Sequence, residues 1–144
     1  MDLMQEIIAR AKADKQRIVL PEGTEERTLK AADRLLADGV ADIILIGNPA
    51  EISYLAANYG LNHIGQATIV DPKNHEKKAA YADLLFQLRQ KKGMTPEKAA
   101  VMVEDPLFLA CLMIKAGDAD GEIAGAQNTT GNVLRPALQI IKTA

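Results

Sequence analysis

The sequence predicts an α/β fold of three layers, in which a mostly parallel sheet lies between two layers of helices. Short runs of consecutive apolar residues alternate with amphipathic helical segments along most of the chain. Such runs are typical of parallel strands that are buried on both faces. Gly or Pro follows most of the runs, where a turn into the next helix is needed. The 144 residues suit one domain, and an apolar content of 48% is enough for a core.

The first half of the chain predicts three helices and three strands. The helices cover 2–14, a segment between Thr24 and Gly39, and a segment from Asn48 to about Gly60, and the strands are the apolar runs 18–20, 43–46 and 67–70. Thr24 is expected to cap the second helix through its hydroxyl, and Gly39 is expected to end that helix in the left-handed conformation. The third helix has a cap at Asn48 and Pro49 at its first position.

The second half of the chain interrupts this alternation with three helices in series. They cover about 75–92, a segment that begins at Thr95-Pro96, and a segment from Asp105-Pro106 to Gly117. We expect them to form a cap or side layer. A fourth strand is predicted at 123–125, and a last helix is predicted to begin near Asn132 or Val133.

Composition and charge argue against several classes of protein. The net charge is −2 and no basic run stands out, so we expect no nucleic-acid partner. No apolar stretch reaches membrane-spanning length, and the N-terminus lacks the features of a signal peptide. The single cysteine, Cys111, fits a small core residue in a reducing compartment, so a cytoplasmic protein is expected. His63 and His75 lack the spacing of metal ligands.

The strongest candidate site is the loop from Asn128 to Asn132 with the helix that follows it. Thr129 and Thr130 offer hydroxyls, Gly131 lets a ligand approach the backbone, and the start of the helix offers free N–H groups. Arg135 is expected in the first helical turn, near the mouth of the site, with Pro136 tolerated for the same reason. This pattern indicates a site for phosphate or carboxylate. An ordinary capped helix with a surface arginine explains the same residues about equally well.

Two further segments allow a functional and a structural interpretation. Arg89 lies in a basic stretch, 86–93, where cations at a helix end complement the helix dipole; this pattern alone favours the structural interpretation. The loop Pro21–Thr24 lies at the same predicted edge of the sheet as the candidate site, but a tight turn with a cap explains it better. The residues alone indicate no nucleophile, no general base and no metal site.

Three stretches of the chain resemble the phosphate acetyltransferase family: RIVLPEGTEERTLKAADRLLADGVADIILIGNP, LRQKKGMTPEKA and GEIAGAQNTTGNVLRPALQIIKTA. The resemblance covers essentially all 144 residues. It implies reversible transfer of acetyl between coenzyme A and inorganic phosphate, with coenzyme A as a substrate and no cofactor or metal. It also implies that Arg89 and Arg135 bind coenzyme A and the phosphoryl substrate, helped by Thr129, Thr130 and Gly131.

The chain departs from the family pattern in two ways. The family often has His-Ser-Thr-Gly-Asp where this chain has Asn128–Asn132. Family members are also more than twice as long, and their two domains hold the active site between them. The resemblance therefore implies that residues 1–144 form an N-terminal α/β domain of isocitrate/isopropylmalate dehydrogenase-like type, without the returning C-terminal segment that completes it.

The resemblance places the catalytic Ser, Arg and Asp of the family late in its longer chains, so we expect no catalytic residue here and no activity from these 144 residues alone. The full-length protein is expected to be a homo-oligomer. Two alternatives stay open. The chain could be a standalone, non-catalytic domain that binds a phosphorylated ligand or a partner protein, or it could belong to a phosphate butyryltransferase-like enzyme.

Overall fold

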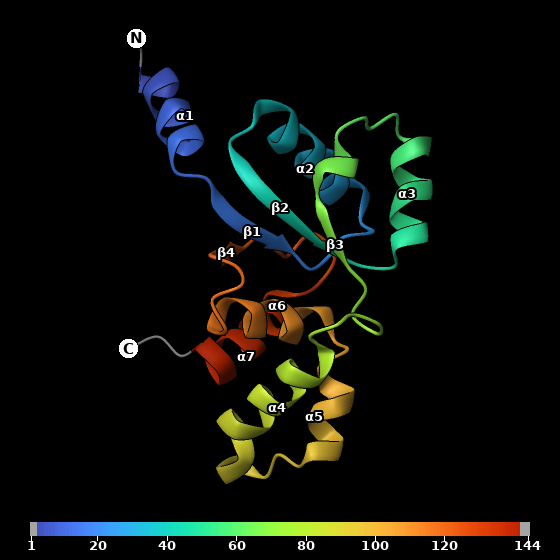
Figure 1. The fold of residues 1–144 in the computed structure, drawn as a ribbon, viewed down its shortest axis with the longest axis vertical. Coiled ribbons are helices and arrows are strands. Elements are labelled where there is room, and N and C mark those ends of the chain that lie inside the picture. Colours follow the sequence, from blue (N-terminus) through green and yellow to red (C-terminus); the bar gives the residue numbers. More distant parts are fainter. Residues whose placement is uncertain (1–2, 142–144) are drawn as a thin grey trace.

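The computed structural model describes residues 3–141, with the side chains of Met4, Ile7 and Ile8 outside the described part (Figure 1). Its elements are, in chain order, α1 (Leu3–Ala13), β1 (Gln16–Leu20), α2 (Glu26–Asp38), β2 (Ala41–Ile46), α3 (Pro49–Asn58), the 3₁₀ turn η1 (Ile64–Gln66), β3 (Thr68–Val70), α4 (Lys78–Arg89), the 3₁₀ turn η2 (Gln90–Lys92), α5 (Pro96–Met102), α6 (Pro106–Lys115), β4 (Gly121–Glu122), α7 (Thr130–Pro136) and the π-helical turn η3 (Ala137–Ile141).

The four strands form one parallel sheet in the order β3-β2-β1-β4. The chain therefore adds β2 and β3 on one side of β1, crosses over through α4, α5 and α6, and places β4 on the other side of β1. The strand order thus reverses between β1 and β4. In open parallel sheets, ligands bind outside the carboxyl ends of the strands at such a reversal.

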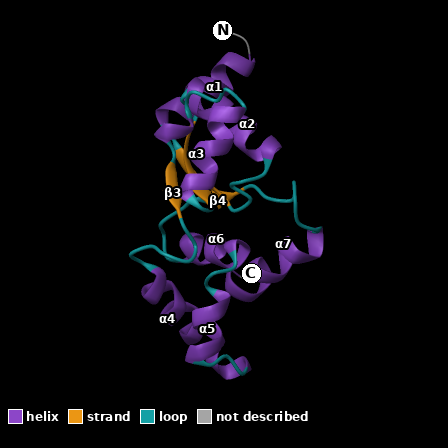
Figure 2. Cartoon of the chain, turned by 90° about the vertical axis from the view of Figure 1, so that its right-hand side faces the viewer, coloured by secondary structure: helices purple, strands orange, loops and turns teal. Residues whose placement is uncertain are grey.

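Helices cover both faces of the sheet, which confirms the predicted three layers (Figure 2). Side chains alternate between the faces along β2, because successive residues of a strand point to opposite sides. Ile43 and Leu45 pack with the buried residues of α2 and α3, whereas Ile44 and Ile46 belong to the core formed with α4 and α6.

Helix α6 is the centre of the second core. Seven consecutive residues of it, Leu107–Met113, are buried. A helix that is apolar all round needs partners on every side, and α6 contacts α4, α7, η3 and β4. Cys111 is fully buried here, as predicted, and burial, which acts more strongly than the Glu122 carboxylate beside it, raises the pKa of its thiol to about 12.

The predicted cap of α2 is wrong. Glu25, and not Thr24, has the extended backbone of a capping residue, and its carboxylate accepts hydrogen bonds from the Thr28 N–H at 2.8 Å and the Thr28 hydroxyl at 3.1 Å. A longer acidic side chain one residue later fills the role that a hydroxyl usually fills. The predicted left-handed end at Gly39 is confirmed, with φ 67°.

The fourth strand also begins and ends earlier than predicted. It covers Gly121–Glu122 and pairs with Ile18 and Val19 of β1. The Ile123 N–H still bonds the Val19 carbonyl at 3.2 Å, but Gly125 has φ 109° and turns the chain away. The apolar run 123–125 was therefore mistaken for the strand, whereas it forms the start of the following loop.

Candidate functional site

A crevice lies outside the carboxyl ends of the strands. It is a cavity of about 380 Å³, within the range of small-molecule sites. Its walls come from the loops after β1 and β2, the start of α6, and residues Gln127 and Asn128, which precede α7. The crevice thus lies where the strand order reverses, and Asn128, the first residue of the predicted site loop, lines it.

Three of the predicted site residues lie together at the start of α7. Thr129 caps this helix, and its hydroxyl accepts a hydrogen bond from the Asn132 N–H at 3.2 Å. Thr130 and Gly131 are the first two helical residues, so their N–H groups precede the first intrahelical hydrogen bond. All three residues are exposed. The helix begins two or three residues earlier than predicted.

Arg135 was predicted in the first turn of α7, and this is wrong, because it lies in the last turn. Arg135 can still serve the start of α7. Gly131 and Arg135 are four residues apart on one helix face, and helical side chains lean toward the N-terminus. Apart from its two chain neighbours and the backbone of its own helix, no atom lies within 4 Å of where a Cβ of Gly131 would be. The exposed guanidinium therefore has open space in which to reach back toward Thr130.

Pro136 also lies outside the first turn. It occupies the seventh helical position, where a proline removes a hydrogen bond and disturbs the helix. The next five residues form the π-helical turn η3, whose wider spacing accommodates this interruption. Pro136 is buried against the core, so packing fixes the position at which α7 changes.

Arg89 is the last residue of α4 and is half-buried. Its carbonyl accepts a hydrogen bond from the Met94 N–H at 3.2 Å, which closes the turn around Gly93. Within residues 3–141 no ion pair holds the side chain of Arg89 or of Arg135. Helix α4 contacts η3, which directly continues α7 along the chain, so the helix that carries Arg89 packs against the segment that follows Arg135. The structure gives no contact that joins Arg89 to Arg135.

Glu22 was not singled out from the sequence, although it is the most strongly bonded side chain of the crevice. It is 4% exposed. Its Oε1 accepts hydrogen bonds from the N–H groups of Gly125 at 2.8 Å and Ala126 at 2.9 Å. Its Oε2 accepts from the N–H groups of Gln127 at 2.8 Å and Asn128 at 2.7 Å, and from the Asn128 side-chain amide at 2.9 Å.

These five donors decide the charge state of Glu22. Burial raises the pKa of the carboxyl, but the hydrogen bonds from Asn128, Gln127 and Ala126 outweigh burial and hold the pKa below its ordinary value. Glu22 is therefore an anion that the protein itself supplies. The N–H and side-chain amide of Asn128 were expected to face a ligand, and this is wrong, because both donate to Glu22.

The sequence does hold a signal for Glu22. A charged residue directly after a buried strand, between Pro21 and Gly23, has little access to water and must find partners in the protein. Gly23 supports this interpretation, since its N–H bonds the Ile46 carbonyl at 3.2 Å and a Cβ there would lie 2.4 Å from the same oxygen. The loop is thus pressed against the end of β2.

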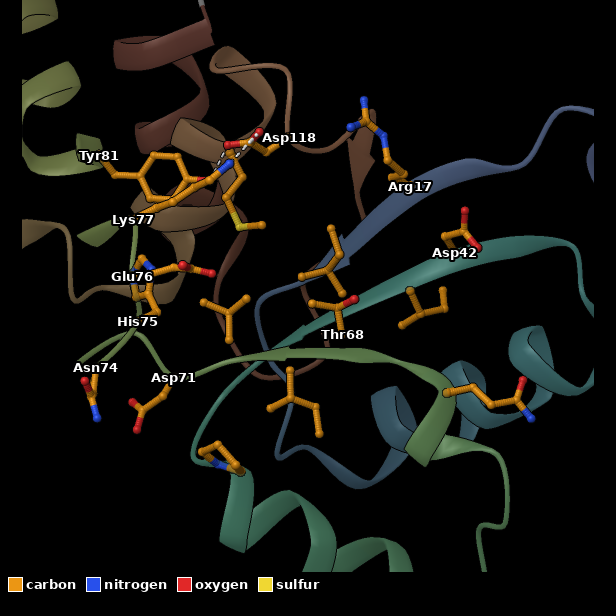
Figure 3. A pocket seen from close by; sticks show the side chains of 17 residues that line it. Arg17, Asp42, Thr68, Asp71, Asn74, His75, Glu76, Lys77, Tyr81 and Asp118 are labelled. Carbon is orange, nitrogen blue, oxygen red and sulfur yellow. Dashed lines mark hydrogen bonds and ion pairs between the residues drawn. The ribbon is translucent and has the colours of Figure 1, made fainter. Parts of the chain in front are cut away.

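A second and larger cavity, of about 770 Å³, lies between the β2–β3 side of the sheet and the α4–α6 layer (Figure 3). Lys77 and Asp118 form an ion pair of 3.2 Å at its rim, and the Tyr81 hydroxyl donates to Asp118. Burial, followed by this hydrogen bond, raises the pKa of Tyr81. No residue of the predicted site loop lines this cavity, whereas Asn128 of that loop lines the crevice, so the larger size of this cavity does not identify it as the site.

Two predicted absences can be compared with the described residues. Among residues 3–141, no group of three His, Cys, Asp or Glu side chains could hold a metal ion. His63 lies instead beside Asp33, at 3.5 Å, and His75 packs near Tyr81. Over the same residues, none of the helices has the length and apolar content that are needed to cross a membrane.

Comparison with known proteins gives a consistent result. The family model described as phosphate acetyl/butaryl transferase matches residues 2–144. The phosphate acetyltransferases of Thermoanaerobacterium thermosaccharolyticum and Acetivibrio thermocellus are 49% and 48% identical over all 144 residues, which cover 43% and 42% of those proteins. The structure of EutD phosphotransacetylase from Staphylococcus aureus matches with a TM-score of 0.87 at 32% identity, over 100% of this chain and 44% of that one.

The chain thus spans less than half the length of these relatives. The sequence comparisons and the structural comparison each cover the whole of this chain. On this evidence the chain belongs to the phosphate acetyl/butaryl transferase family.

Proposed function

We propose that the protein transfers acetyl reversibly between coenzyme A and inorganic phosphate. One observation carries the proposal: relatives named phosphate acetyltransferase align with all 144 residues at nearly half identity. In this reaction the thiolate of coenzyme A attacks the carbonyl carbon of acetyl phosphate. The C–S bond forms, the bond from carbon to the phosphate oxygen breaks, and phosphate leaves with the electron pair.

The residues of this chain would supply binding to this reaction. Both substrates are polyanions, and arginine binds phosphate oxygens with two parallel hydrogen bonds while it stays charged. Arg135 lies four residues after Gly131 on α7, and Thr129, Thr130 and Gly131 would offer hydroxyls and N–H groups to the same oxygens. Arg89 would hold a second phosphate from the end of α4. The absence of an ion pair at both arginines among residues 3–141 supports these roles, since no described carboxylate neutralises either charge.

The test is formation of acetyl-CoA from acetyl phosphate and coenzyme A by the enzyme expressed from its complete gene. Arg135→Ala and Arg89→Ala should each lower kcat/KM by about 10–100-fold, the cost of about 1.4–2.7 kcal/mol of lost transition-state stabilisation. Arg34→Ala is a matched control, because Arg34 is an exposed arginine of α2 whose ion pair, within the described part of the chain, is with Asp38 in the same helix. A wild-type enzyme that does not form acetyl-CoA would refute the proposal.

The family description includes butyryl transfer as well as acetyl transfer. Assaying butyryl phosphate beside acetyl phosphate separates the two, and we propose acetyl because the relatives named above are all phosphate acetyltransferases. A second α/β domain, a homo-oligomer and a cytoplasmic location belong to the same proposal. They rest on the family resemblance and, for the location, on a chain whose single cysteine is buried and unpaired.

A further inference from the structure

Glu22 joins the two walls of the crevice where the strand order reverses. It extends from the loop after β1, and it binds the loop that follows β4, more than 100 residues later in the chain. Between β1 and β4 the sheet itself contributes only two residue pairs. This is fewer than the pairs between β1 and β2 or between β2 and β3. The carboxylate therefore adds five hydrogen bonds between the segments that follow β1 and β4, where the pairing of the sheet is shortest.

The geometry of this contact is complete. A carboxylate has about four lone-pair directions, and four successive N–H groups and one amide converge on the two oxygens of Glu22. Four N–H groups in a row point to one side because Gly125 adopts φ 109° and curls the backbone, as in the anion-binding loops called nests. Hydrogen bonds to a charged acceptor are stronger than those between neutral groups.

A second side chain holds the same loop from the other side. The guanidinium of Arg27 donates one hydrogen bond to the Ala126 carbonyl and another to Glu25 at 3.0 Å. Ala126 is thus bound through its N–H by Glu22 and through its carbonyl by Arg27. The loop reaches Asn128 in a fixed conformation, and the next three residues are Thr129, Thr130 and Gly131.

We propose that Glu22 is a positioning residue of the substrate site, which acts by fixing the 125–128 loop and thereby the place where α7 begins and where Arg135 is aimed. Glu22 does not touch the substrate in this account. Its carboxylate takes up the N–H groups of the loop, so that the incoming phosphate is left to Thr129, Thr130, Gly131 and Arg135. The inference rests on the proposed function for the identity of the ligand.

The test compares Glu22→Gln with Glu51→Gln in the chain as it stands. Gln has the shape of Glu, but it is uncharged and turns an N–H₂ toward donors. Glu51 lines the same crevice, its side chain is exposed, and within residues 3–141 no hydrogen bond of its carboxylate is found. Both variants remove one negative charge from the crevice. Only the first replaces one of the two oxygens that accept the five hydrogen bonds with an N–H₂ group, which cannot accept them, so a general electrostatic effect would appear in both.

The first readout is the pH dependence of the backbone amide resonances of residues 125–128. In the wild type, the four amides should shift together with one apparent pKa below the ordinary value of a glutamate, about 4.3. In Glu22→Gln the common titration should disappear and the four amides should exchange faster with solvent, whereas Glu51→Gln should resemble the wild type. Four amides that titrate separately, or that keep their behaviour in Glu22→Gln, would overturn the inference.

The second readout is the affinity for coenzyme A and for inorganic phosphate. Glu22→Gln should weaken both by about 10–100-fold, since a displacement of about 1 Å in a binding group has effects of that size. Unchanged or tighter binding would overturn the inference, because it would mean that Glu22 only competes with the ligand. A wild-type chain that binds neither probe would refute the proposed function instead, and the common titration of the four amides would still be expected.

Discussion

Gly23 lies so close to the end of β2 that even a methyl side chain would collide with the backbone there. A Cβ at this position would lie 2.4 Å from the Ile46 carbonyl oxygen and 3.0 Å from its carbon, and both atoms belong to the backbone at the end of β2. The neighbouring Glu22 binds the 125–128 loop from the same turn. The Pro-Glu-Gly sequence therefore serves both strand packing and the crevice.

We predict that Gly23→Ala destabilises the fold by about 1–3 kcal/mol, the usual cost of forcing extra atoms into a packed region. Chemical denaturation measures the free energy of unfolding. Gly65→Ala is the control, because no atom lies within 4 Å of its Cβ position and its φ is not in the left-handed region. Equal effects of the two substitutions would contradict the close approach at Gly23.

Within the described part of the chain, Glu122 has a half-buried carboxyl group that, unlike that of Glu22, receives no strong hydrogen bond to stabilise its charge. Its Oε2 is buried with no hydrogen-bond partner among the described residues, and only the Cys111 thiol donates weakly to its Oε1, at 3.8 Å. Burial raises the pKa of Glu122, and the charge of Glu22 raises it further. A carboxyl whose folded pKa is raised costs stability when the pH rises above its unfolded value, since ionisation is then harder in the fold.

We therefore predict that Glu122→Gln stabilises the fold at pH 7, by a few degrees in Tm, which is the effect of about 1 kcal/mol in a chain of this size. Thermal unfolding followed by circular dichroism at pH 7 and pH 4 measures it. The gain should shrink at pH 4, because this pH lies below the ordinary pKa of a glutamate, about 4.3, and the penalty for ionising Glu122 in the fold is lost there. A lower Tm at pH 7 would contradict the account.

For helix α7, the sequence predicted the residue types of the site but not the exact start of the helix. The polar loop, the hydroxyl cap and the arginine were recognised, because they follow local rules of capping and charge. Arg135 was expected in the first turn and lies in the last, because the helix begins at Thr130, two or three residues before the predicted start. Glu22 was missed because its partners lie more than 100 residues away, and no local rule connects them.

The three-layer architecture was predictable for a related reason. Continuous apolar strands, and the glycines and prolines that end them, are local features of the sequence. The structure has strands at the first three of these runs. The end of β4 was not predictable from the apolar run 123–125, since the left-handed φ of Gly125 and the bonds to Glu22 take that backbone out of the sheet.

Helix α6 should be the most sensitive element, because it lies between the sheet and the other helices. Leu109 is fully buried, so Leu109→Ala should cost about 2–5 kcal/mol of unfolding free energy. Val101→Ala in α5 is the control, because Val101 is 72% exposed and an exposed site should change by less than about 0.5 kcal/mol. A loss at Leu109 no larger than that at Val101 would mean that α6 is not the packing centre.

Acid sensitivity is a property of the whole molecule, since several carboxylates join segments far apart in the chain. The carboxylate of Asp120 accepts hydrogen bonds from the guanidinium of Arg17 at 2.9 Å and from the backbone N–H of Arg17 at 2.7 Å. These bonds lower the pKa of Asp120 to about 2. Burial raises the pKa of Glu25, but hydrogen bonds from Arg27 and Thr28 outweigh it and lower the pKa to about 2. The pKa of Glu22 is lowered as well.

Groups with a lowered folded pKa stabilise the fold above their unfolded pKa, and this stabilisation is lost as the pH falls toward the folded value. We predict that Tm falls progressively from about pH 5 to about pH 2. Thermal unfolding across this range measures the slope, and Glu22→Gln should flatten it whereas Glu51→Gln should not. A Tm that stays constant down to pH 3 would contradict the assigned hydrogen bonds.

The most direct measurement is a calorimetric titration of coenzyme A into this 144-residue chain, comparing the wild type with Arg135→Ala and with the control Arg34→Ala. Our account predicts saturable binding by the wild type and by Arg34→Ala, and binding weakened by about 10-fold or more in Arg135→Ala, as expected when a charged hydrogen-bond donor is lost. Identical titrations of the wild type and Arg135→Ala would contradict the claim that the loop before α7 and its arginine form the phosphate-binding part of an acetyl-transfer site.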